Sequence, residues 1–204
     1  MVNNIDALVV QITSDKDPDK AKSLLNERAD KAKEFYEEFR PSKVIASGGI
    51  CYTTPNRDEV KPQSLQLAEI MNDKGIKNIE TQTMSGDTWT NVVFTYFDHI
   101  RPMGLEKPDI GVVGFHRYES LANLILGDNA SVKLLNNEEM SFLRDDLLGL
   151  VLDTSFKFYG AKDGDPFSHL RAICNYHPEV GHKPMKSAPY YTALKAMKGL
   201  NSFS

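Results

Sequence analysis

The segment PDIGVVGFHRYESLANLIL (residues 108–126) decides the fold, because an apolar run in it passes directly into a helical pattern. Residues 108–115 form a short apolar run, which is typical of a strand inside a parallel sheet. Residues 116–126 repeat apolar side chains near the period of a helix. A strand that leads at once into a helix predicts a parallel sheet covered by helices.

The same alternation of strand and helix extends through the chain on both sides of this segment. Further strands are predicted at 5–12, 43–49, 77–83 and 130–135, and helices at 14–39, 59–76 and 83–99. We therefore expect an α/β fold, a Rossmann-like three-layer sandwich with a mostly parallel sheet.

The pattern changes from about residue 128. A capped helix is predicted at 136–160, and the stretch beyond it carries scattered aromatic residues with a weak helical pattern near 188–198. We expect residues 1–135 to form the Rossmann-like core and residues 136–204 to form a C-terminal helical extension packed on the same domain.

Composition and charge limit the class of protein. The chain has 204 residues, a formal net charge of −4 and a pI near 5.7, which argues against nonspecific binding to nucleic acid or to an anionic membrane. Two cysteines, Cys51 and Cys174, form no CxxC pair and fit a reducing compartment. The apolar start is interpreted as a strand instead of a signal peptide, and no apolar stretch approaches the length of a membrane span. We expect a cytoplasmic protein with no nucleic-acid partner and no membrane insertion.

Small, hydroxylated or ionisable residues follow each of the first four predicted strands. They are Gln11, Thr13 and Ser14; Ser47, Gly48 and Gly49; Ser85, Gly86 and Asp87; and Gly114, His116 and Arg117. In an open parallel sheet, ligands bind beyond the carboxyl ends of the strands. The sequence therefore predicts a ligand site at this edge of the sheet.

The helix predicted from residue 83 onward carries a polar stripe, because Thr88, Asn91 and Thr95 lie at helical spacing. One interpretation is local capping, with Ser85 or Asp87 at the N-cap. The other is that Ser85, Thr88 and Asn91 line the ligand site, since a helix start with hydroxyl groups suits a phosphate or carboxylate. On this second reading Thr95, two turns inside the helix, is a packing residue.

The pair Gly48–Gly49 also has two interpretations. Glycine permits a tight turn at the end of a strand, or it lets backbone N–H groups approach an anion or a sugar closely. The chain contains neither GxGxxG nor GxxxxGK[ST], so it lacks both common nucleotide-binding fingerprints.

Three ionisable residues complete the predicted site. His116 is the candidate catalytic residue, as a proton shuttle or donor, with a structural histidine as the alternative. Arg117 is a candidate partner for a phosphate or carboxylate. Glu59 is a dipole-compensating carboxylate or an acceptor for a ribose-like hydroxyl. The other histidines lack HxxH and HExxH spacing, so no metal is assigned.

Four segments in this order resemble the YdcF-like family, a domain of unknown function that includes the SanA and ElyC envelope proteins. The segments are ERADKAKEFYEEFRPSKVIASGG (27–49), DEVKPQSLQLAEIMNDKGI (58–76), ETQTMSGDTWTNVVF (80–94) and PDIGVVGFHRYESLANLIL (108–126). The positions that match the family pattern are Arg28, Ala32, Ser47 to Gly49, Glu59, Ser85, Thr88, Asn91 and His116.

The resemblance implies a Rossmann-like fold with a polar crevice for a nucleotide-like ligand, for which S-adenosylmethionine is a candidate. This chain departs from the family at the first strand, which continues as VVQITSDKD where a glycine-rich turn is usual, and at Gln63, where a glutamate is common. Two hypotheses follow. The chain is a small-molecule-binding protein, with catalysis left open, or it is a non-catalytic interaction module whose crevice is vestigial.

Overall fold

The structure is a computed structural model that describes residues 4–12, 18–49, 60–85, 88–136 and 160–179. Five parallel strands form one sheet in the order β3-β2-β1-β4-β5. The strands are β1 (Ala7–Gln11), β2 (Lys43–Ser47), β3 (Ile79–Gln82), β4 (Asp109–Val113) and β5 (Ser131–Leu134). The predicted α/β, Rossmann-like fold is thereby confirmed.

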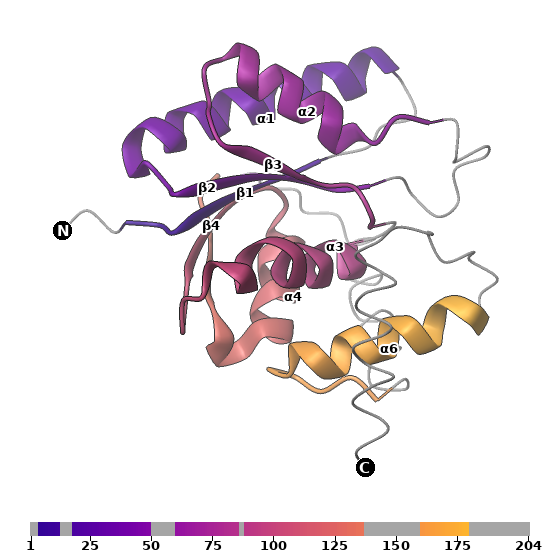
Figure 1. Cartoon of the computed structure of the whole chain (residues 1–204). Coiled ribbons are helices and arrows are strands. Elements are labelled where there is room, and N and C mark those ends of the chain that lie inside the picture. Colours follow the sequence, from indigo (N-terminus) through magenta and orange to yellow (C-terminus); the bar gives the residue numbers. More distant parts are fainter. Residues whose placement is uncertain (1–3, 13–17, 50–59, 86–87, 137–159, 180–204) are drawn as a thin grey trace.

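Helices cover both faces of this sheet (Figure 1). On one face lie α1 (Pro18–Phe39) and α2 (Gln63–Asp73), and on the other lie α3 (Thr88–Thr95), α4 (His116–Leu126) and α6 (Pro166–Glu179). Short turns of other helix types, η2 (Tyr96–Ile100), η3 (Arg101–Met103) and η4 (Gly127–Asn129), extend α3 and α4. The order strand, helix, strand therefore holds from β1 to β5.

Alternate residues of the central strands supply two separate hydrophobic cores. In β1, Ala7 and Val9 belong to the core under α3 and α4, whereas Leu8 and Val10 belong to the core under α1 and α2. Val9 pairs with Ile45 of β2 on one side, and all of β1 is buried. Burying a side chain of this size contributes about 1.5–3 kcal/mol, so the apolar runs seen in the sequence stabilise this architecture.

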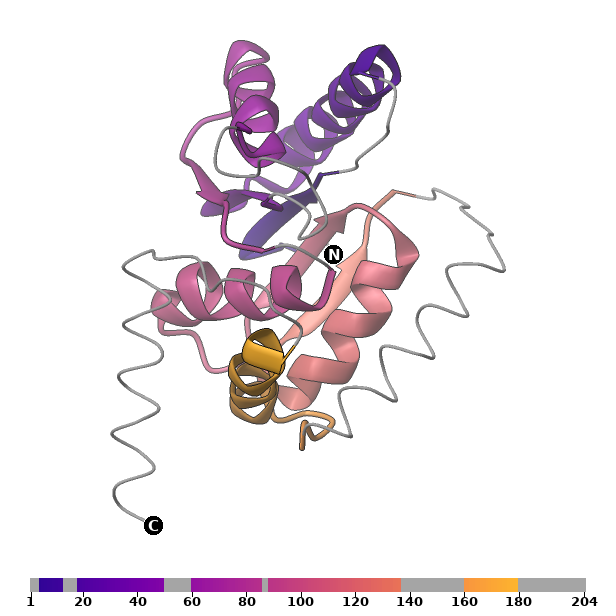
Figure 2. The same cartoon turned by 90° about the vertical axis from the view of Figure 1, so that its right-hand side faces the viewer.

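Helix α6 packs against α3 and α4 on the same face of the sheet (Figure 2). The sequence pattern did not locate this helix, although Asp165 and Pro166 mark its start: the Asp165 Oδ1 accepts a hydrogen bond of 3.1 Å from the Ser168 N–H. The helices predicted at 136–160 and near 188–198 lie outside the described residues.

An ionic network lies at the amino end of β2. This is the edge of the sheet opposite the carboxyl ends of the strands, where the site is predicted. Lys43 Nζ lies 2.9 Å from one carboxylate oxygen of Glu80, and the other oxygen lies 2.7 Å from His99 Nδ1. Lys43 also donates to the His99 carbonyl at 3.1 Å. These contacts hold η2, a π-helical turn, against the first residues of β2 and β3.

In the part of the chain that the structure describes, no helix combines the length and the apolar character needed to cross a membrane.

Candidate functional site

The strand order places a switch point between β1 and β4. β1 is flanked by β2 on one side and by β4 on the other, and the chain builds the two halves of the sheet outward in opposite directions. In such sheets, ligands bind beyond the carboxyl ends of the two strands at the switch point. These ends point toward the right in Figure 1.

A buried arginine joins the carboxyl ends of β1 and β4. Arg28, from α1, donates through Nη1 to the Gln11 carbonyl at 3.0 Å and to the Val113 carbonyl at 3.5 Å. Its guanidinium lies 4.2 Å from the centre of the Phe115 ring, and the residue is only 2% exposed. Because a guanidinium stays protonated at every physiological pH, Arg28 fixes a positive charge at the switch point.

Two amide side chains shape the turn that follows β4. Asn136 accepts from the Gly114 N–H at 2.8 Å and donates to the Gly114 carbonyl at 3.1 Å. The Gln11 Oε1 accepts from the Phe115 N–H at 3.2 Å. A Cβ at position 114 would come within 3 Å of Gln11, so glycine is needed for this close approach. The turn that leads into α4 is therefore rigidly held from three sides by Arg28, Gln11 and Asn136.

Helix α4 begins directly beyond this turn. Phe115 occupies its N-cap position in an extended conformation and offers no side-chain acceptor to the first N–H groups of the helix. The partial positive charge at a helix start adds to the charge of Arg28. His116 and Arg117 form the first turn, which puts their backbone at the switch point; their side chains lie outside the described residues.

Two residues of the polar stripe of α3, Asn91 and Thr95, are buried and meet the end of β2. The Ser47 hydroxyl donates to Asn91 Oδ1 at 2.5 Å and lies 2.5 Å from the Thr95 hydroxyl. Because Ser47 has one proton, which goes to Asn91, the Thr95 hydroxyl is the donor of the second bond. Asn91 Nδ2 also donates to the Ser47 carbonyl at 3.4 Å. Ser47 thus occupies polar groups of Asn91 and Thr95, two of the three residues of the predicted stripe.

Tyr118 extends this buried network to α4. Its phenol lies beside the Thr95 and Ser47 hydroxyls and has one proton to donate to them. Burial raises the pKa of Tyr118 to about 12, although these hydroxyls act to lower it. One chain of hydrogen bonds thus joins the end of β2 to the start of α4 through α3. A small cavity, lined mainly by apolar residues such as Val9, Ile110 and Ala122, lies beside Thr95 and Tyr118.

The Gly48 and Gly49 amides, which are predicted to face a ligand, have hydrogen-bond partners within the protein. The Gly48 N–H donates to the Gln82 carbonyl at 3.0 Å, and the Gly49 N–H donates to the Ser85 hydroxyl at 2.9 Å. A Cβ at either position would overlap neighbouring atoms, those of Ile12 at Gly48 and of backbone carbonyls at Gly49. Gly48 also has φ of +141°, which disfavours other residues. Both glycines therefore serve close packing of the turn.

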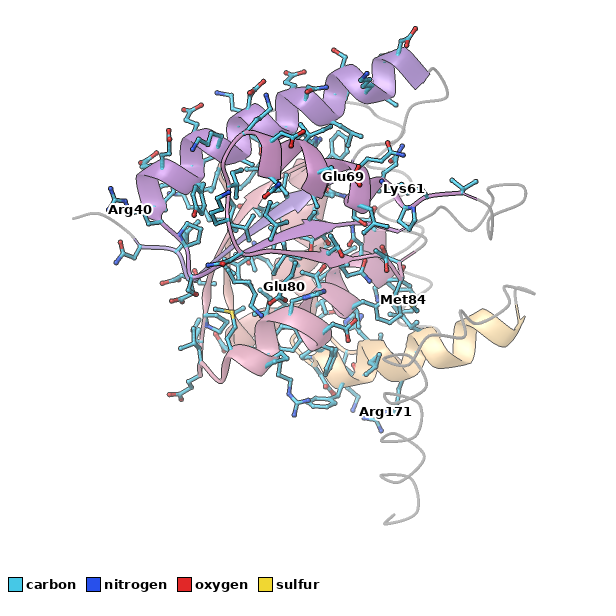
Figure 3. All side chains as sticks on the ribbon, turned by 45° about the horizontal axis from the view of Figure 1, so that its top comes forward. Arg40, Lys61, Glu69, Glu80, Met84 and Arg171 are labelled. Atoms are coloured by element: carbon cyan, nitrogen blue, oxygen red, sulfur yellow. The ribbon has the colours of Figure 1, made fainter. Side chains whose placement is uncertain are left out.

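Ser85 supports the same turn. With the Gln82 amide oriented to donate, its nitrogen reaches the Ser85 hydroxyl at 2.9 Å, and its oxygen accepts from the Met84 and Ser85 N–H groups at 3.2 and 3.3 Å. Ser85 is 2% exposed. Figure 3 shows Met84 at the end of β3, on the side of the sheet that α6 covers.

Two predicted site residues differ from this buried set. Thr88 is partly exposed at the first position of α3, where it borders the edge of the sheet. Glu59 lies outside the described residues.

Several residues at the site were missed by pattern alone. Gln11 was noted only as a strand-end residue and Arg28 only through the family resemblance, while Tyr118 and Asn136 were not singled out. The sequence indicates that Arg28 is buried, because it lies on the apolar side of α1 together with Leu25, Ala29 and Ala32. No sequence spacing specifies which strand end such a side chain reaches.

The groups at the switch point carry positive charge. Among the described residues, no three His, Cys, Asp or Glu side chains gather as metal ligands. The fixed charge of Arg28 and the start of α4 instead complement a phosphate or carboxylate.

Comparison of the chain with protein-family models, with curated proteins and with solved structures returned no match. The resemblance to the YdcF-like family therefore stays a prediction.

Proposed function

We propose that this protein binds a nucleotide-like small molecule, through an anionic phosphate or carboxylate group of that molecule, at the switch point between β1 and β4. The observation that carries the proposal is the buried Arg28, which two strand-end carbonyls hold at the carboxyl ends of these strands. A charge that costs several kcal/mol to desolvate is retained where this fold class binds its ligands.

The start of α4 supplies the second half of the proposed site. Its first N–H groups, in the turn formed by His116 and Arg117, face away from the body of the helix, and Phe115 cannot cap them. An anionic group bound there experiences the helix start and Arg28 together. The residues of α4 thus take the role that the sequence assigned to Gly48 and Gly49.

His116 is proposed as the residue that exchanges a proton with the ligand. Its position in the first turn of α4 places it beside the proposed anion site. Imidazole titrates near neutral pH, so it can donate to or accept from a ligand oxygen. S-adenosylmethionine and other nucleotide-like compounds are the candidate ligands, in line with the resemblance described above.

A ligand screen tests the proposal. We expect at least one of AMP, ADP, S-adenosylmethionine, NAD or a sugar phosphate to raise the unfolding temperature in a saturable way, with about 2.7 kcal/mol of added stability at a hundredfold excess over Kd. Arg117→Ala should weaken that effect. Arg40→Ala is the matched control, because Arg40 lies at the opposite end of the sheet from Met84 (Figure 3).

A non-catalytic interaction module is the second candidate. The observation that favours it is that polar groups of Ser47, Gly48, Gly49 and Asn91 form hydrogen bonds within the protein. Fewer of the predicted residues are then left to contact a ligand. On this account no compound of the panel stabilises the wild type.

A further inference from the structure

The contact between α3 and α6 contains a buried hydrogen bond between two aromatic side chains. Trp89 Nε1 lies 3.1 Å from His169 Nδ1, and the rings meet edge to face with centroids 6.2 Å apart and an interplanar angle of 79°. Trp89 is 2% exposed and His169 is 1% exposed. The bond joins the second residue of α3 to the first turns of α6.

The direction of this bond determines the protonation state of His169. An indole N–H only donates, so His169 Nδ1 must be the acceptor and carries no proton. The neutral ring then has its proton on Nε2. An imidazolium carries protons on both nitrogens, and its Nδ1–H would point at the indole N–H. The docked geometry is therefore compatible with neutral His169 alone.

Two further contacts at the start of α6 join backbone and amide groups, which do not titrate. The Gly164 N–H donates to the Leu124 carbonyl at 2.8 Å, and Asn129 Nδ2 donates to the Gly164 carbonyl at 3.1 Å. Leu170, Ala172 and Ile173 of α6 pack in the core that also holds α3 and α4. Protonation of His169 thus acts on the contact between α6 and α3, while the turn before α6 stays bonded to Leu124 and Asn129.

The charged groups around α6 have other contacts. α3 contributes no ionisable residue between Thr88 and Thr95. The charged and titratable residues on α4, η2 and η3 are His116, Arg117, Tyr118, Glu119, Tyr96, Asp98, His99 and Arg101. Asp165 directly precedes α6, and α6 itself carries Arg171, Cys174, Tyr176, His177 and Glu179 in addition to His169.

Four of these groups have contacts that the structure defines. Glu119 accepts from the Leu134 N–H, His99 pairs with Glu80, Asp165 accepts from the Ser168 N–H, and Arg101 lies over the Phe167 ring at 4.9 Å. Arg171 is exposed and projects from α6 (Figure 3). These four groups therefore have partners other than His169, and Trp89 presents a donor to the His169 ring.

We propose that Trp89 and His169 form a pH-sensitive latch, which holds α6 on α3 while His169 is neutral and releases it when His169 takes up a proton. This inference is independent of the proposed ligand. It assigns a conformational response to acid in the range in which histidine titrates.

The full-length chain allows a direct test because Trp89 is its only tryptophan. Between pH 8 and pH 5 we expect the Trp89 emission to shift to longer wavelength, and the single indole N–H cross-peak to move and lose protection from exchange. Amide exchange in α6, corrected for the intrinsic effect of pH, should rise by about tenfold or more while the strands stay protected.

Two variants separate the latch from other titrations. His169→Gln keeps an oxygen that accepts from the indole but cannot titrate, so its Trp89 emission should be flat over the same pH range. His99→Gln, which removes an imidazole bonded to Glu80, should retain the wild-type transition.

Three results would overturn the proposal. The first is a wild-type Trp89 emission and an indole N–H cross-peak that do not change between pH 8 and pH 5. The second is the same emission transition in His169→Gln as in wild type. The third is loss of protection from amide exchange in the strands at the same pH as in α6. If His169→Gln does not fold, the wild-type cross-peak and exchange data decide the question alone.

Discussion

Ser47 has a central role at the scale of single residues, because its hydroxyl is shared by Asn91, Thr95 and Tyr118. Its side chain is fully buried at the last position of β2. Each buried polar group left without a partner costs about 1–3 kcal/mol. The network therefore contributes to stability mainly through what its loss would leave unpaired.

We expect Ser47→Ala to lower the free energy of unfolding by about 2–4 kcal/mol, since it leaves both Asn91 Oδ1 and the Thr95 hydroxyl without their bond to Ser47. Urea unfolding at pH 7 measures the change. Ser131→Ala, at an exposed position in β5, is the matched control and should stay within about 0.5 kcal/mol of wild type. A loss for Ser47→Ala as small as that of the control would contradict the network.

Because Tyr118 belongs to the same network, the free energy of unfolding should depend on pH in the alkaline range. Burial raises its pKa to about 12, above the ordinary value of 10. Below pH 10 the phenol is neutral in both the folded and the unfolded state, so the full contribution of Tyr118 to stability is present. As the pH rises from 10 toward 12, the unfolded state loses the proton first, so stability falls by up to about 1.4 kcal/mol per pH unit.

Unfolding measured at pH 9 and pH 11 tests this sign. Tyr118→Phe should be less stable than wild type at pH 9 but should lose less between the two pH values. Tyr36→Phe, a partly buried tyrosine on α1, should keep the wild-type slope. Equal slopes for wild type and Tyr118→Phe would show that the phenol is not buried as described.

At the scale of elements, the π-helical turn η2 depends on the contacts of Lys43, Glu80 and His99. Burial alone would raise the pKa of the Glu80 carboxyl, but hydrogen bonds from Lys43 and His99 outweigh it and lower the pKa. A lowered pKa adds stability that is present above the ordinary value near 4.5 and is lost as the pH falls through the folded value.

We expect wild type to lose up to about 1 kcal/mol more than Glu80→Gln when the pH falls from 6 to 3, the small size reflecting a carboxylate that is 42% exposed. Glu69→Gln is the control, because Glu69 pairs with Lys61 with both side chains largely exposed (Figure 3). Urea midpoints across the pH series measure the difference. The same loss in both variants would contradict the role given to Glu80.

The helices and strands also show which elements a sequence pattern can predict and which it cannot. The runs in β1, β2 and β4 are apolar because both faces are buried, so they were predicted within a few residues. α6 was not located, because its start follows a turn and an isolated bridge between Lys162 and Asp165, and its apolar side chains are few. A sequence pattern reflects burial by the whole fold, and that signal is weak for a peripheral helix with few apolar side chains.

At the scale of the whole molecule, the edge of the sheet was predictable and the partners of its side chains were not. The alternation of strands and helices requires that strand ends meet at one edge, which places Gln11, Ser47, Ser85 and Gly114 together. Spacing does not specify whether a hydroxyl bonds to a ligand or to a neighbouring element. Asn91 bonds to Ser47, 44 residues away, and such a contact follows only from the packed structure.

The proposed site between the carboxyl ends of β1 and β4 binds the phosphate or carboxylate group of a nucleotide-like molecule. The most direct measurement is a titration of the isotope-labelled full-length chain with AMP, ADP, S-adenosylmethionine, NAD and a sugar phosphate, followed by amide chemical shifts. The account predicts saturable shifts for at least one compound, centred on Gln11, Gly114, Phe115 and the first turn of α4. No saturable shift with any compound, or shifts centred on Lys43 and His99 at the opposite edge, would contradict it.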